Sequence, residues 1–324
     1  MEKYRNIIVS AAALMAMAGC IRDEYESCPP LTIEVTVQDK NWSNIDEAVA
    51  EGLAAAVSED LPFRDYVQSL TYELRDLSTG EIVSSAAAYP VSHDGLSEIL
   101  TFPESLPFGT YEINLWGNLY PSSKSEGVSV PDNGTVSVTL HEDGDGEAAQ
   151  VYHLCDTVYY NYDAASFAAG LQRTVGCLLV DAVNLPDGID WSAKDLDGVL
   201  GTVSRGLEYS DPVSVHTELD WGVDAAAKRS MTCVGPSAAE NGTSLQVTFR
   251  DTDSAAAGDD ATGIALMTDG FTGDAASGKV TDPVSLTLRR NELTMVRYDY
   301  DGQGFRISVF VDGDWVTIHD MEVD

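Results

Sequence analysis

The sequence predicts an all-β protein made of two tandem antiparallel β-sandwich domains. Apolar and polar residues alternate along many short segments, which is the pattern of strands buried on one face. Glycine, proline and aspartate separate these segments, as turns separate the strands of a sandwich. The length of 324 residues suits about two domains of ~150 residues each.

The first predicted sandwich contains four alternating segments, at residues 31–37, 70–75, 111–115 and 136–140. We expect one helix, from Ile45 to Val57. This segment is rich in alanine and carries Asp46 and Glu47 in its first turn. Gly52 weakens the helix, because glycine is a poor helix former.

The second half is predicted to begin with a central strand from Val175 to Val183, which is apolar on both faces. Further strands are expected at residues 213–215, 245–249, 264–266 and 284–288. The chain finishes with two hairpins that turn at Asp301-Gly302 and at Asp312-Gly313, since Asp-Gly between alternating runs indicates a hairpin.

The predicted boundary between the domains follows the acidic, glycine-bearing stretch from His141 to Glu147, where the strand pattern pauses. We place it between residues 141 and 170. The division that we adopt is a signal peptide at 1–19, a first domain at 20–148 and a second domain at 149–324.

The chain is strongly acidic, with 53 acidic and 18 basic side chains and a net charge of −35. Phosphate binding relies on Lys and Arg, so the balance argues against nucleic acid as a partner. An anionic bilayer would also repel this surface. We interpret the excess of acids as a solvated surface and not as a binding site.

The first residues have the layout of a secretory signal, with a basic head at Lys3 and Arg5 and an apolar run from Ile7 to Ala18. The run is too short to span a bilayer, which takes ~20 residues. It ends in Met17-Ala18-Gly19-Cys20, which resembles a bacterial lipobox with Met17 in the usual place of Leu. We therefore predict cleavage after residue 19 and lipidation of Cys20. The alternative is an ordinary signal cut near Gly19.

The residues after Cys20 predict the destination of the protein. Arg22, Asp23 and Glu24 resemble the export signal of Bacteroidetes surface lipoproteins. We expect the chain on the outer face of the outer membrane. The several acyl chains of a mature lipoprotein would make a stable anchor there.

Four cysteines remain after Cys20, namely Cys28, Cys155, Cys177 and Cys233. An even number in an exported protein permits disulfides, and four cysteines allow three pairings. No pair has CxxC or zinc-ligand spacing. Cys177 lies in an apolar strand, where a buried free thiol is the alternative to a disulfide. The pairing therefore stays open.

Motifs that carry chemistry do not appear in complete form. The stretch Gly273 to Val280 lacks the Ser or Thr that a P-loop needs after its lysine. Asp143, Asp145 and Glu147 have calcium-loop spacing without the required glycine and twelfth-position Glu. No HExxH or GxSxG motif is present. We expect no enzyme activity, no cofactor and no metal site.

Several stretches in a fixed order carry a resemblance to a known family. Cys20 to Pro29 leads directly into the strand Leu31 to Val35. The later stretches are Pro107 to Tyr111 with Trp116-Gly117-Asn118, Arg173 before 175–180 with Leu185-Pro186, and Leu286 to Leu293. From the leader to about residue 318 the chain resembles the Bacteroidetes FimB/Mfa2 fimbrial anchor lipoproteins.

This resemblance implies two transthyretin-like domains in a subunit of surface fimbriae, rooted in the outer membrane by its lipid. The implied partners are other fimbrial subunits. Related fimbriae join by strand exchange, and an open sheet edge readily accepts a strand. The alanine-rich segment 45–58 and the acidity depart from the family, which leaves a base or tip position in the filament open.

Two other functions compete with this one. A surface glycan-binding lipoprotein of a polysaccharide-utilisation system shares the leader and the stacked β domains, and an exposed aromatic platform would favour it. Its candidate residues are Trp42, Trp116, Trp191, Trp221 and Trp315, which packing also explains. A hydrolase would need two carboxylates ~5–10 Å apart in a pocket.

Overall fold

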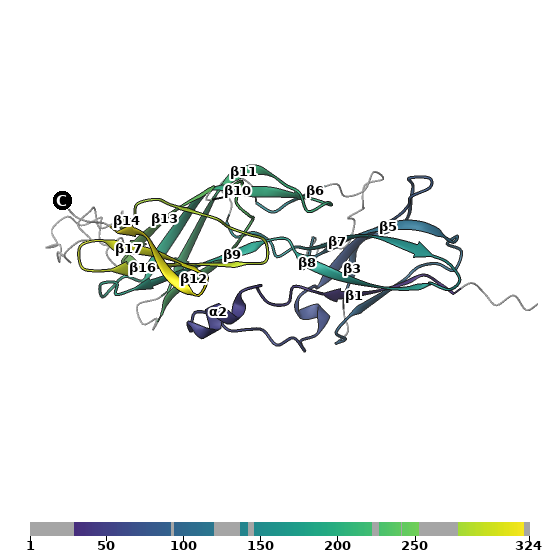
Figure 1. Cartoon of the computed structure of the whole chain (residues 1–324), viewed down its shortest axis with the longest axis horizontal. Helices are drawn as coiled ribbons and strands as arrows, with labels where there is room; N and C mark the ends of the chain where they lie inside the picture. The colour runs from purple at the N-terminus through teal and green to yellow at the C-terminus, as the bar shows by residue number, and fades with distance from the viewer. Residues whose placement is uncertain are drawn as a thin grey trace, which may run out of the picture.

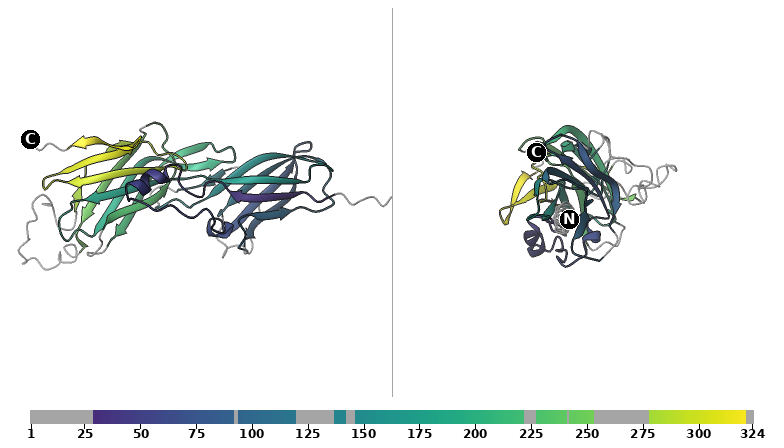
Figure 2. Two further views of the ribbon diagram at one scale, coloured as in Figure 1. Left: turned by 60° about the horizontal axis from the view of Figure 1, so that its bottom comes forward. Right: turned by 90° about the vertical axis from the view of Figure 1, so that its right-hand side faces the viewer.

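The computed structural model describes residues 29–91, 94–119, 137–141, 146–221, 227–240, 242–252 and 278–320. It confirms an all-β protein with sandwiched sheets. Two β-rich halves lie end to end along the long axis (Figure 1), and the same arrangement is visible from a second direction (Figure 2). The predicted strand 264–266 lies outside the described residues, as do Asp143, Asp145 and most of the stretch that resembles a P-loop.

The first half is a sandwich made from a seven-stranded sheet that folds over on itself. The sheet order is β3-β2-β5-β7-β8-β1-β4. Its strands are β1 (Thr32–Val37), β2 (Ser69–Asp76), β3 (Ile82–Pro90), β4 (Glu98–Thr101), β5 (Gly109–Gly117), β7 (Tyr152–Tyr160) and β8 (Ser166–Arg173). A short 3-10 helix, η1 (Phe63–Asp65), precedes β2.

The fold-over occurs at the end of β8. This strand pairs with β1 from Ser166 to Leu171, but with β7 only at Gln172 and Arg173. Two layers result, and their alternating residues meet in one core that includes Leu31, Ile33, Val35, Leu70, Leu74, Tyr111, Ile113 and Leu115. The period-two pattern therefore identifies the buried faces correctly.

The second half is a sandwich of two separate sheets. One contains β6 (Ser137–Thr139), β10 (Trp191–Ser204), β11 (Tyr209–Asp220), β13 (Thr243–Arg250), β14 (Lys279–Val280) and β15 (Val284–Leu286). The other has the order β12-β9-β16-β17-β18 and contains β9 (Gly176–Val183), β12 (Lys228–Val234), β16 (Leu293–Tyr300), β17 (Phe305–Val311) and β18 (Asp314–Asp320). Residues of both sheets form its core, among them Leu178, Leu196, Val247, Phe249, Val296 and Tyr298.

Two pairings depart from the predicted antiparallel pattern. β1 runs parallel to β8, and β9 runs parallel to β16. Parallel neighbours need a long connection between them, and in each case several strands intervene along the chain. Alternation along a single strand shows which face is buried but not the direction of the neighbouring strand.

Strand membership divides the chain later than the predicted boundary at 148/149. β7 and β8 complete the first sheet, and β9 begins the second half, so the final crossing lies near residues 174–175. β6 precedes both strands in sequence, yet it pairs with β10 in the second half. Along the chain, β6 therefore belongs to the second half, β7 and β8 belong to the first half, and all strands from β9 onward belong to the second half. A division into two separate domains stays a prediction.

The predicted helix is shorter than expected, because α2 spans only Ile45–Ala50. Gly52 adopts a positive φ of 66°, and the backbone N–H of Leu53 donates to the carbonyl of Ala48 at 2.8 Å. The N–H of Gly52 donates to the carbonyl of Val49 at 3.0 Å, which completes a Schellman motif that ends a helix.

Residues 40–57, which we call the strap, reach from the first half onto the second. Figure 1 shows α2 beside the second half although β1 and β2 belong to the first. Ala48 and Leu53 of the strap pack with Leu179, Leu293 and Met295 of the five-stranded sheet. The alanine-rich segment therefore covers the outer face of that sheet.

Candidate functional site

The predicted lipidation site Cys20 and the predicted export signal Arg22, Asp23 and Glu24 lie outside the described residues and stay predictions. The described chain begins at Pro29, at the outer end of the first half (Figure 1). The hydroxyl of Tyr160 donates to the Pro29 carbonyl at 2.7 Å. This contact fastens the start of the described chain to the end of β7.

Exposed aromatic side chains gather at this same end of the first half. Phe108, Tyr159 and Tyr162 are all exposed. The register of β5 with β7 places Gly109 opposite Tyr160 and Thr110 opposite Tyr159, so the three rings share one end of the sheet. Phe108 also contacts Tyr160, with 4.9 Å between the ring centroids. We call Phe108, Tyr159 and Tyr162 the outer-end aromatic cluster.

The opposite half carries an open sheet edge at β18. Among the described strands, β18 pairs only with β17. Its sequence, Asp-Trp-Val-Thr-Ile-His-Asp, is rich in β-branched and aromatic residues and contains neither proline nor lysine. Val316 is 47% exposed and Ile318 is 43% exposed. An unpaired edge with exposed apolar side chains is a template for a further strand.

Four of the other described edge strands are shortened, bent or interrupted. β4 has four residues, and β14 has two. β3 ends at Pro90, and its register with β2 shifts twice. β11 contains Pro212, preceded by Asp211 with a φ of 59°. These are devices by which proteins discourage pairing at an edge. β12, the other edge of the five-stranded sheet, begins with Lys228 and Arg229, and charged side chains on an edge strand also oppose pairing. Of the described edges, β18 is therefore the best suited to accept a strand.

The strap holds the first residues of β18 in place. The indole N–H of Trp315 donates to Oε2 of Glu51 at 2.9 Å. The guanidinium of Arg297 lies 4.0 Å from the centroid of the Trp315 ring. A strand that is already held in an extended form loses less conformational entropy when it binds a partner strand.

The junction between the halves is built around Arg173, the last residue of β8. Its Nη2 donates to the carbonyls of Asp39 and Lys40 at 3.1 and 3.4 Å. The same nitrogen donates to the hydroxyl of Tyr152 at 3.2 Å. Its guanidinium also lies 3.9 Å from the centroid of the Trp42 ring. This buried side chain ties β8, β7 and the start of the strap together.

A second arginine joins the two halves directly. Nη1 of Arg290, which precedes β16, donates to Oδ2 of Asp39 and to the carbonyl of Arg173, both at 3.0 Å. The side chain of Asn44 in the strap exchanges two hydrogen bonds of 2.9 Å with the backbone of Leu293. These contacts favour one fixed arrangement of the halves.

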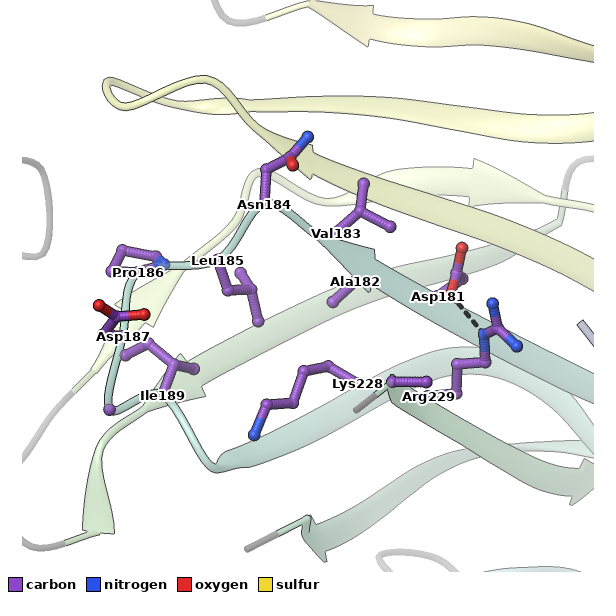
Figure 3. A pocket seen from close by; sticks show the side chains of 12 residues that line it. Asp181, Ala182, Val183, Asn184, Leu185, Pro186, Asp187, Ile189, Lys228 and Arg229 are labelled. Carbon is purple, nitrogen blue, oxygen red and sulfur yellow. Dashed lines mark hydrogen bonds and ion pairs between the residues drawn. The ribbon is translucent and has the colours of Figure 1, made fainter. Parts of the chain in front are cut away.

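A shallow cavity of about 410 Å³ lies where β9 runs into the loop 184–190 (Figure 3). Its carboxylates include Asp181, but both oxygens of that side chain are engaged. Oδ1 accepts from Nε of Arg229 at 2.7 Å, and Oδ2 accepts from Nε of Arg297 at 2.9 Å. Asp181 therefore serves to join β9, β12 and β16 and is not placed to act as an acid or base.

All five tryptophans of the sequence are described, and none is exposed. Trp116 and Trp191 are buried. Trp42, Trp191 and Trp315 each lie beneath an arginine guanidinium, and Trp221 stacks on Phe249. The tryptophan platform that would favour glycan binding is thus not formed.

Within the described ranges, no group of three His, Cys, Asp or Glu side chains is arranged to hold a metal ion. None of the described helices has the length and apolar character needed to cross a membrane.

The comparisons with known proteins concern the fold. No protein-family model and no curated protein sequence matches the chain significantly. Solved structures do match over most of its length. One is a protein from Bacteroides ovatus described as an adhesin, with a TM-score of 0.51, 15% identity and coverage of 93% of this chain and 98% of the other. Another, from Bacteroides thetaiotaomicron, is described as polysaccharide-binding, with a TM-score of 0.51, 13% identity and coverage of 90% and 99%.

A third match is the fimbrial anchor protein Mfa2 from Porphyromonas gingivalis, with a TM-score of 0.50, 12% identity and coverage of 89% of this chain and 99% of the other. None of these three proteins is described as an enzyme. At such identities the likeness concerns the fold. The resemblance seen in the sequence is confirmed at that level: this chain has the two-sandwich fold of the fimbrial anchor protein Mfa2.

Proposed function

We propose that this protein is a lipid-anchored subunit of a cell-surface fimbria, which roots or terminates a filament in the outer membrane. The observation that carries the proposal is the separation of two features. The described chain begins at the outer end of the first half (Figure 1), whereas β18, whose outer edge no described strand covers, belongs to the second half. The arginine junction holds these halves together. An anchor needs this arrangement, because it must hold a membrane at one end and a neighbouring subunit at the other.

Attachment to the membrane rests on the predicted lipid at Cys20. The nine residue steps from Cys20 to Pro29 span at most ~30 Å when fully extended. The first half would therefore stay close to the bilayer. The outer-end aromatic cluster suits the headgroup region of the bilayer, because the Tyr side chain has an apolar ring and a polar hydroxyl and is enriched at the membrane–water interface. The acidic surface elsewhere would keep the second half away from anionic lipids.

Attachment to the filament would use the edge of β18. A strand from the next subunit would pair with the backbone N–H and C=O groups of β18 that no described strand uses, and its side chains would cover Val316 and Ile318. The implied partners are thus other fimbrial subunits.

The anchor role is tested by replacing Cys20 with Ala. We expect the variant to leave the membrane fraction and the filaments to detach from the cell. Filaments that stay cell-bound with unchanged length would refute the anchor role.

The edge role is tested with Val316→Lys and Ile318→Lys, since lysine on an edge strand opposes pairing. Val83→Lys is a matched control, because Val83 is also an exposed valine in an edge strand but lies on β3. We expect the two β18 variants to lose copurification with filament subunits while Val83→Lys keeps it. Equal copurification of all three variants would show that β18 is not the contact.

Glycan binding keeps one candidate surface, the outer-end aromatic cluster, because its three rings are exposed. A Tyr159→Ser/Tyr162→Ser double variant separates the two functions. As a membrane-facing surface, the cluster should matter for association of the lipidated protein with vesicles but not for polysaccharide binding. Specific polysaccharide binding that the double variant loses would favour the surface glycan-binding lipoprotein instead.

A further inference from the structure

Two buried cysteines face each other across neighbouring strands of the second half. In the antiparallel pairing of β9 with β12, Cys177 lies directly opposite Cys233. Residues directly opposite each other in an antiparallel pair project from the same face of the sheet. Both residues are buried and are held as free thiols in the structure.

The backbone hydrogen bonds show which kind of pair they form. The N–H of Cys233 donates to Oε1 of Glu147 at 2.9 Å, and its carbonyl accepts from the N–H of Ala148 at 2.8 Å. The N–H of Cys177 donates to the carbonyl of Glu292 at 2.9 Å, on the side of β16. The amide groups of both cysteines thus point away from the partner strand, so the two form a non-hydrogen-bonded pair.

This kind of pair brings the two residues unusually close. Opposite Cα atoms in a non-hydrogen-bonded pair lie about 4.5 Å apart, compared with about 5.5 Å in a hydrogen-bonded pair. Disulfides join Cα atoms that are about 4.4–6.8 Å apart. A sulfur–sulfur bond can therefore form here without movement of the strands.

We propose that Cys177 and Cys233 form a cross-strand disulfide in the exported protein. The two thiols lose two protons and two electrons, and one sulfur–sulfur bond forms. The electrons reduce the disulfide of an exported thiol–disulfide oxidoreductase to two thiols. The inference goes beyond the fimbrial role and shares with it only the expectation that the chain leaves the reducing cytosol.

The third described cysteine is not placed to compete. Cys155 lies on β7 in the first half, opposite Asn114. The fourth, Cys28, lies outside the described residues. Of the pairings that the sequence leaves open, the geometry supports the one that contains Cys177 with Cys233.

The surroundings of the pair set when the bond would form. The neighbouring Cys177 thiol and burial both raise the pKa of the Cys233 thiol. Exchange needs a thiolate, so oxidation of the closed sheet is slow. The bond should therefore form while the chain folds, before β12 docks against β9. Once the sheet has closed, burial of both sulfur atoms would also keep reductants away from the disulfide.

The disulfide would fasten an edge strand of the second half. β12 is the last strand of the five-stranded sheet, and its Arg229 donates to the carbonyl of Gly52 in the strap at 2.6 Å. The closed loop includes β10 and β11, and closing it restricts the unfolded chain. Such a bond suits a subunit that carries mechanical load, because it would join β12 covalently to β9.

The test is peptide mapping of the full protein purified from the cell envelope. Free thiols are blocked with N-ethylmaleimide under denaturing conditions, and the protein is digested without reductant. We expect the peptides that contain Cys177 and Cys233 to be linked, with a mass lower by two hydrogen atoms than the sum of the separate peptides. Recovery of both peptides blocked and unlinked would overturn the proposal.

A second arm separates a failure of the geometry from a failure of the export expectation. The reduced protein is refolded with oxidised glutathione and mapped in the same way. A link that forms here but is missing in the envelope protein overturns the proposal, and it shows that the expected oxidising compartment is the part that is wrong. A link that forms in neither overturns it through the geometry. Cys155→Ser is the matched control and should keep the link, whereas Cys233→Ser should abolish it.

Discussion

The buried lysine of the second sandwich offers the sharpest test of its packing. Lys194 lies on β10 opposite Val247, a residue of the core, and is 2% exposed. Its Nζ donates to the hydroxyl of Thr232 on the opposing sheet. Burial lowers the pKa of Lys194 from 10.5 to about 8, although Cys177 and Glu147 nearby act in the opposite direction.

The expected size of the effect comes from this shift. A depression from 10.5 to about 8 corresponds to about 3 kcal/mol at ~1.4 kcal/mol for each unit. At pH 7 the ammonium is charged in both the folded and the unfolded state, so burial of the charge lowers the free energy of unfolding by the full amount. Between pH 8 and 10.5 the unfolded chain binds more protons than the folded chain, so stability rises with pH.

The Lys194→Met variant keeps much of the side-chain volume and removes the charge. We expect it to be about 2 kcal/mol more stable at pH 7. Removal of the buried charge stabilises the fold by about 3 kcal/mol, and loss of the hydrogen bond to the Thr232 hydroxyl destabilises it by roughly 1 kcal/mol. This advantage should shrink as the pH approaches 10. The assay is denaturant unfolding of both proteins at pH 7 and pH 10, compared as a difference so that the other titrating groups cancel.

Lys279→Met is the matched control, because the Lys279 ammonium makes an exposed hydrogen bond of 3.4 Å to the Gln303 carbonyl. We expect it to change neither the stability nor its dependence on pH by a comparable amount. The reasoning is wrong if Lys194→Met is destabilising at pH 7, or if its advantage over the unmodified protein is the same at both pH values.

Three further outcomes are expected in unfolding experiments. Arg173→Lys should lower the free energy of unfolding by about 2 kcal/mol, because lysine cannot reproduce the hydrogen bonds that the Arg173 guanidinium makes while it lies over Trp42. Arg64→Lys is the control and should cost little, because Arg64 forms an exposed ion pair. Equal losses in the two variants would contradict the stabilising role of Arg173 at the junction. Burial lowers the pKa of His153 to about 4, so the unfolded chain binds a proton first and the free energy of unfolding should fall as the pH drops from 6.5 to 4. In His153→Gln this fall should be smaller by about 3 kcal/mol. The same fall in both proteins would contradict the prediction. Gly52→Ala should cost about 1 kcal/mol from its positive φ alone, because a Cβ there meets no atom within 4 Å; a neutral result would mean that the end of the strap helix readjusts.

Much of the strand content follows from the sequence, but some strands escape the period-two pattern for a physical reason. β10 places Lys194 and Ser192 at inward positions, where alternation predicts apolar residues. These polar side chains conceal the longest strand of the second half. β8 is similarly concealed, because it leaves one layer for the other near its end and is rich in small residues.

The candidate site divides in the same way. The hairpin that creates β18 is visible in the sequence as Asp312-Gly313 between alternating runs, and Arg173 stands out in the family resemblance. The partners of both residues are distant along the chain. Trp315 meets Glu51, and Arg173 meets Asp39. A pattern local to one segment carries no information about contacts over such separations.

Four properties follow from the amino-acid sequence alone: the all-β class, the buried face of most strands, the acidic surface and the expectation of a lipidated leader. These properties are local, since they depend on composition and on the alternation of neighbouring side chains. The folded structure is needed to see which described edge is unpaired, how the strap joins the halves and which cysteines face each other. Strand register and direction arise from long-range pairing, and a period of two fits many pairings equally well.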